Sequence, residues 1–126
     1  MPVEVRGVRD AKRSGKAELS AVLQQEAQGL AKALPSRAYV LALDIKGRSI
    51  DSPGLAKLLT TLEVKGVRDL AVLIGGPFGL AQELLDRADT RLSLSRLTFT
   101  HEMARLICLE QLYRACTIRA GEPYHH

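Results

Sequence analysis

The chain has few aromatic residues and few cysteines. Phe, Trp and Tyr together make up 4% of its 126 residues, and Trp is absent. The core must therefore be aliphatic, and an RNA-binding surface would offer few aromatic rings for base stacking. Cys108 and Cys116 are eight residues apart, a rise of about 12 Å if both lie on one helix. That is too far for a disulfide, so both are expected to be small core residues in a reducing compartment.

Long apolar runs and metal-ligand motifs are also missing. No uncharged apolar segment reaches the length of a membrane-spanning helix, and no signal peptide is recognisable. We therefore expect a cytoplasmic protein with no membrane partner. No spacing of His and Cys is typical of a metal site, so no metal is expected. Hydrophobic residues make up 46% of the chain, and residues 1–126 are expected to form a single domain.

Positive charge is in excess, with a net charge of +4 and a pI of about 9.3. This permits a polyanionic partner without establishing one. Five cations lie close together near the start of the chain, where the only acids are Glu4 and Asp10: Arg6, Arg9, Lys12, Arg13 and Lys16. These cations are consistent either with a solvated loop or with contacts to phosphate groups.

Short apolar segments alternate with helical patterns along the chain. Strands are expected at residues 2–8, 39–43, 70–74 and 91–94, and helices at about 19–34, 53–65, 80–88 and 102–118. Ser52 is expected to cap the second helix, with Pro53 at its first position. This alternation predicts an α/β fold with a mainly parallel sheet and helices on both faces.

The last expected helix is apolar around nearly its whole circumference. Its apolar residues include Met103, Leu106, Leu109, Leu112 and Cys116. Such a helix is normally buried on several sides, either at the centre of a monomer or against a second subunit. The residues alone leave both possibilities open.

Two segments could approach a ligand. Residues 75–79, Gly-Gly-Pro-Phe-Gly, follow an expected strand and precede a helix, where glycines allow close backbone approach. The spacing is not that of a dinucleotide-binding motif, and a plain tight turn is the alternative. Residues 94–99 mix polar and apolar side chains, so they could wrap an aromatic ligand.

Four segments in order resemble one family: residues 73–79, 92–99, 110–115 and 121–125. The family is that of the RlmH-type pseudouridine N3-methyltransferases of large-subunit ribosomal RNA, which are SPOUT proteins. The resemblance implies a C-terminal trefoil knot, S-adenosylmethionine as methyl donor and no metal. It also implies a homodimer that methylates N3 of a pseudouridine in 23S ribosomal RNA, on the assembled ribosome.

The resemblance also implies roles for individual residues. The donor would contact Leu43, Gly75, Leu94, Ser95, Arg96, Leu97, Thr98 and Phe99. The active site would be lined by His101, Arg114, Tyr124 and His125. Arg114 suits anion stabilisation, while His125 or His101 could accept the proton of the ring nitrogen.

The sequence departs from the family pattern at three places. Family members usually begin with a further strand and helix, so we expect an N-terminally shortened form. Thr100 stands where a Pro usually precedes His101, and His126 replaces a final Lys or Arg. Two alternatives therefore remain: a SPOUT RNA methyltransferase with another target base, or a catalytically silent ribosome-binding module that retains the donor pocket.

Overall fold

The three strands of the described chain form one parallel sheet. The computed structural model describes residues 19–75 and 79–121. Its elements, in chain order, are α1 (Leu19–Ala33), β1 (Tyr39–Ser49), α2 (Ser52–Val64), β2 (Leu70–Leu73), α3 (Gln82–Arg87), β3 (Thr90–Ser93) and α4 (His101–Arg119). The strand order is β2-β1-β3, with β1 in the centre. The expected parallel α/β class is confirmed, while the strand expected at residues 2–8 lies outside the described residues.

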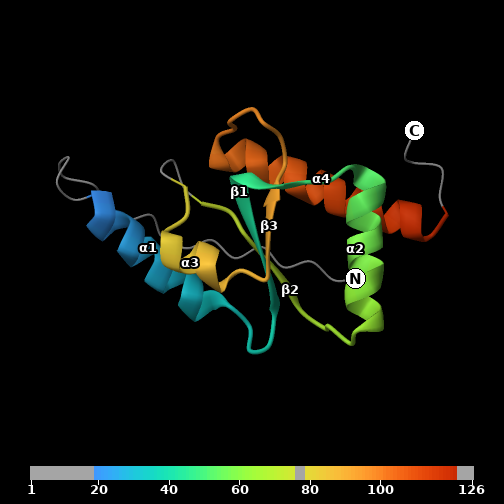
Figure 1. The fold of residues 1–126 in the computed structure, drawn as a ribbon, viewed down its shortest axis with the longest axis horizontal. Coiled ribbons are helices and arrows are strands. Elements are labelled where there is room, and N and C mark those ends of the chain that lie inside the picture. Colours follow the sequence, from blue (N-terminus) through green and yellow to red (C-terminus); the bar gives the residue numbers. More distant parts are fainter. Residues whose placement is uncertain (1–18, 76–78, 122–126) are drawn as a thin grey trace.

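Helices cover both faces of this sheet, as expected (Figure 1). Side chains alternate between the two faces of a strand, so apolar residues that are neighbours in sequence belong to two separate clusters. On one face, α1 and α3 pack against the sheet around Ala27, Val40, Leu73 and Leu84. On the other face, α2 and α4 pack together around Leu55, Ala56, Leu59 and Ala115, with Leu70 of β2 against them.

β1 is longer than the sequence predicts. It continues past Leu43 to Ser49, but its pairing with β3 skips from Leu43 to Arg48, both opposite Leu92. The intervening residues therefore bulge out of the ladder. Glycine is required at position 47, where β1 rejoins β3, because a Cβ there would lie 2.8 Å from the backbone nitrogen of Leu92.

The N-terminal caps of α2 and α4 come from the residues immediately before each helix. Asp51 caps α2, accepting a hydrogen bond at 2.7 Å from the amide of Gly54. The expectation that Ser52 is the cap is wrong, because Ser52 is already the first helical residue. Thr100 caps α4 through its hydroxyl, which accepts from the amide of Met103 at 3.3 Å.

The apolar circumference of α4 divides into two faces. Cys108 and Ala115 are buried, and Leu112 packs against the cluster shared with α2. On the opposite side, Met103, Leu106 and Tyr113 are 48%, 61% and 56% exposed. One face therefore belongs to the core of the chain, and the other is an apolar surface.

Cys108 and Cys116 are both free thiols, as expected. None of the helices within residues 19–75 and 79–121 combines the length and apolar character needed to cross a membrane.

Candidate functional site

The carboxyl ends of the three strands meet at one edge of the sheet. Because the strands are parallel and β1 bulges out of the ladder after Leu43, Leu43 lies toward this edge together with Gly75 after β2 and Leu94 after β3. In open parallel sheets, ligands bind outside the carboxyl ends of the strands. The fold therefore brings the three segments expected to hold a donor to the same place.

Leu43 and Leu94 line one small cavity beneath this edge. The cavity has a volume of about 20 Å³ and lies between the sheet and the inner sides of α2 and α4. Its other lining residues are Leu41, Leu55, Val72, Leu92, Cys108, Gln111 and Leu112. A drug-sized or cofactor-sized ligand needs a cleft of about 300 Å³ or more, so it cannot lie inside this cavity. Leu43 and Leu94 would instead form an apolar floor beneath a ligand at the edge.

Cys108, which lines this cavity, has an unreactive thiol. Burial raises the pKa of its thiol from 9.0 to about 11, because the thiolate would lose its hydration. The thiol is therefore protonated at neutral pH, and only a thiolate is an effective nucleophile. Cys108 serves as a core residue rather than as a reactive group.

Gly75, which follows β2, lies very close to the backbone of Gly79 and Leu80. A Cβ on Gly75 would lie 2.6 Å from the carbonyl oxygen of Gly79 and 2.9 Å from the nitrogen of Leu80. Glycine is thus required at position 75 by the approach of the chain's own backbone, which is the tight-turn alternative for this segment. Residues 76–78 lie outside the described residues.

The loop of residues 94–99 offers backbone groups to a ligand. Its described hydrogen bonds are local: the Ser93 hydroxyl donates to the carbonyl of Ser95, and the Leu97 amide donates to the Ser95 hydroxyl. In the described ranges, the amides of Arg96, Thr98 and Phe99 have no hydrogen-bond partner. Leu97 is 71% exposed. Such amides can donate hydrogen bonds to the edge of a planar ring, while the exposed Leu97 side chain can lie against its face.

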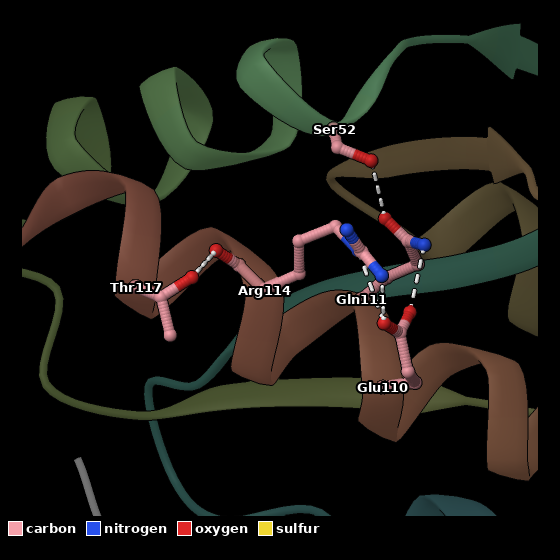
Figure 2. A network of polar contacts seen from close by, with 5 residues as sticks. All are labelled: Ser52, Glu110, Gln111, Arg114 and Thr117. Atoms are coloured by element: carbon pink, nitrogen blue, oxygen red, sulfur yellow. Dashed lines mark hydrogen bonds and ion pairs between the residues drawn. The ribbon is translucent and has the colours of Figure 1, made fainter. Parts of the chain in front are cut away.

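Arg114 belongs to a polar network that joins α4 to the start of α2 (Figure 2). Its Nε and Nη2 atoms donate to Oε1 of Glu110 at 3.0 and 2.5 Å. The other carboxylate oxygen accepts from Gln111, whose own oxygen accepts from the hydroxyl of Ser52 at 2.6 Å. The network fixes the direction of the guanidinium group, whose side chain is 24% exposed.

His101 and Arg114 lie at different ends of α4. His101 is the first residue of the helix and Arg114 follows thirteen residues later, a rise of about 20 Å. Within one chain, these two side chains therefore cannot act on the same ring atom. Tyr124 and His125 lie outside the described residues.

Glu110, Gln111 and Ser52 were not anticipated as site residues. A Glu four residues before an Arg on a helix is usually a solvated surface pair, so Glu110 gave no distinctive signal. The polar residue Gln111 among apolar neighbours on α4 is a signal that could have been used. No described group of three or more His, Cys, Asp or Glu side chains is placed to hold a metal ion.

Comparisons with known proteins give a consistent result. Residues 1–125 match the family described as "Predicted SPOUT methyltransferase". The chain is 50% identical over 113 residues to the ribosomal RNA large subunit methyltransferase H of Desulfotalea psychrophila, covering 88% of this chain and 74% of that protein. It is 48% identical to the protein of that name from Halothermothrix orenii, covering 86% and 69%. It is 42% identical to the one from Syntrophotalea carbinolica, covering 100% and 80%.

Proposed function

Because this chain belongs to the SPOUT methyltransferase family, we propose that it methylates N3 of a pseudouridine in large-subunit ribosomal RNA, on the assembled ribosome. The methyl donor is S-adenosylmethionine, as in other members of that family. The observation that carries the proposal is the match along residues 1–125, together with 42–50% identity to proteins named ribosomal RNA large subunit methyltransferase H. The site segments at the sheet edge support it.

The residues at the carboxyl edge fit a nucleoside-bearing donor. Leu43 and Leu94 supply an apolar floor, and the exposed Leu97 can cover a planar ring. The amides of Arg96, Thr98 and Phe99 are available to the polar edge of a base, and Gly75 allows the close approach of Gly79. We also propose that this loop forms a knot, as in other SPOUT proteins.

The chemistry requires a proton acceptor and a cation on the substrate side. Bound S-adenosylmethionine supplies an electrophilic methyl group on a sulfonium. The ring nitrogen of pseudouridine carries a proton, so it becomes a good nucleophile only when that proton leaves. Arg114, held by Glu110, is proposed to stabilise the resulting anion. Within one chain, the proposed proton acceptor is His125, with its sequence neighbour Tyr124, because His101 of the same chain lies too far from Arg114.

The exposed apolar face of α4 supports a homodimer. Leu106 and Tyr113 are seven residues apart, so they project from the same side of the helix, and Met103 lies one turn before Leu106. Large apolar side chains gathered on one helix face usually mark an interaction surface. A second copy of the chain is the proposed occupant, and His101 could then serve a site completed by the partner chain.

Two measurements on the purified protein test the proposed function. Isothermal titration with S-adenosylmethionine should show binding, and label from its methyl group should appear in the RNA of large ribosomal subunits. Mapping of the labelled nucleotide should identify methylated pseudouridine. Methyl transfer to another base would favour the alternative of a different target, whereas donor binding without any transfer would favour a catalytically silent module.

A further inference from the structure

A second cavity lies at the opposite, amino-terminal edge of the sheet. It has a volume of about 400 Å³ and is formed by the turn before β1 and the turn before β2. Three cations line it, Arg37 from the first turn and Lys65 and Arg68 from the second, together with the carboxylate of Asp69. The cavity is therefore strongly cationic, and no step of the proposed methyl transfer uses it.

Among the residues that the structure describes, no carboxylate forms an ion pair with any of these three cations. Arg91, Arg114 and Arg119 each form an ion pair with a carboxylate. By contrast, the side chains of Arg37, Lys65 and Arg68 are exposed and make no ion pair or hydrogen bond within residues 19–75 and 79–121. Like charges around one cavity repel each other unless an anion lies between them.

A backbone hydrogen bond joins the two turns that form this cavity. The carbonyl of Asp69 accepts a hydrogen bond at 2.8 Å from the amide of Tyr39, which fastens the two turns to each other. Arg37 has a φ of 63°, in the left-handed region that side-chain-bearing residues rarely adopt. Strained positions of this kind cluster at ligand sites. The facing turn has Gly66, with a φ of 83°, where this conformation carries no strain.

We infer that this cavity binds a phosphate group of the ribosomal RNA backbone at a distance from the methylated base. The inference rests on the proposed function, because it gives the substrate a second contact. The strand segment from Tyr39 to Leu43 separates the two edges by about 13 Å, so a folded RNA can reach both. Arg and Lys contacts to phosphate position a nucleic acid without reading its sequence. The cavity should therefore contribute to RNA affinity and not to the chemical step.

A pair of double variants tests this inference. Lys65→Gln with Arg68→Gln removes two cavity cations, and Lys32→Gln with Lys57→Gln removes two exposed cations elsewhere. We expect the cavity variant to raise the KM for large ribosomal subunits about tenfold, with unchanged kcat and donor affinity. In co-sedimentation, the slope of log affinity against log salt should fall by about one for each lost phosphate contact. The control should change KM less than twofold.

The Arg37→Gly variant tests the contribution of this guanidinium to RNA binding without destabilising the fold. Glycine accepts the left-handed backbone at this position, so the unfolding midpoint should not fall. The KM for ribosomal subunits should still rise severalfold, because the guanidinium is lost. A KM equal to that of the wild type would contradict the inference.

The remaining outcomes are also decisive. Equal KM values and equal salt slopes for the two double variants would overturn the inference. Binding of inorganic phosphate that the cavity variant loses, with unchanged affinity for ribosomal subunits, would make this a small-anion site and overturn it as well. A wild-type protein that transfers no methyl group would contradict the proposed function. Co-sedimentation with ribosomal subunits would still show whether the cavity cations contribute to RNA binding.

Discussion

Arg114 donates two hydrogen bonds to the same carboxylate oxygen of Glu110, from Nε at 3.0 Å and from Nη2 at 2.5 Å. Glu110 is itself held by Gln111 through its other oxygen. The guanidinium is therefore fixed by a chain of contacts that reaches Ser52 on α2. This arrangement makes Glu110 a positioning residue for the proposed anion-stabilising group.

Replacing Glu110 by Gln should slow methyl transfer without weakening donor binding. The substitution keeps the shape of the side chain but removes the charge that orients Arg114. We expect a single-turnover rate at saturating ribosomes about tenfold lower, and Arg114→Ala about a hundredfold lower. Ser52→Ala is the control, because it removes only the far end of the network. A wild-type rate for Glu110→Gln would show that the ion pair is structural.

Enlarging Gly75 should weaken donor binding. A Cβ there lies 2.6 Å from the carbonyl oxygen of Gly79, so the turn must open when Gly75 is replaced by Val. We expect the affinity for S-adenosylmethionine to fall at least about tenfold, or roughly 1.4 kcal/mol. Gly66→Asn is the control, since its Cβ meets open space and Asn tolerates a left-handed backbone. An unchanged affinity in a folded Gly75→Val protein would count against this donor site.

The strands and their faces could be predicted because apolar patterning follows burial directly. The segments around Leu41 and Val72 are continuous apolar runs, which are typical of strands in a sheet covered on both faces. The extension of β1 to Ser49 was not predicted, because its second half is polar and pairs only after a bulge. The bulge depends on contact with β3, which no local pattern reveals.

The candidate site was predictable only in part. Leu43 and Leu94 were expected near one ligand and do line the same cavity. The role of Asp51 as the cap of α2 was missed, because Ser52 is an equally good capping residue by type. The separation of His101 from Arg114 follows from the length of α4, which a resemblance to a family does not measure.

Gly47→Ala should destabilise the fold. The added methyl group would lie 2.8 Å from the backbone of Leu92, and a strand backbone cannot move aside as a flexible side chain can. We expect the free energy of unfolding to fall by about 1–3 kcal/mol, the usual cost of overpacking. Urea denaturation measures this loss. A midpoint equal to that of the wild type would mean that β1 and β3 separate easily at this point.

A charge on the outer face of α4 should separate the proposed dimer. We expect the wild type to sediment as a dimer at micromolar concentration and Leu106→Glu as a folded monomer, because burying an unpaired carboxylate is costly. Val64→Glu is the matched control, since Val64 is 82% exposed on α2. Leu112 is unsuitable for this test, because it packs inside the chain. A monomeric wild type would contradict the dimer.

Stability should decrease at alkaline pH through Cys108. Its folded pKa of about 11 lies above the ordinary value of 9.0, so the unfolded chain releases this proton more readily. The contribution is fully present below pH 9.0 and is lost as the pH rises toward about 11. The difference in unfolding free energy between wild type and Cys108→Ala should therefore shrink across this window. A difference that stays flat across this window would contradict the burial of Cys108.

The proposed methyl transfer is tested most directly by mass spectrometry of ribosomal RNA from cells that lack this protein. Nuclease fragments of large-subunit RNA from the deletion strain should be lighter by one methyl group at a single pseudouridine. Restoring the wild-type protein should restore that mass, whereas the Arg114→Ala variant should not. Identical fragment masses with and without the protein, or a missing methyl group on a different base, would contradict the proposed activity.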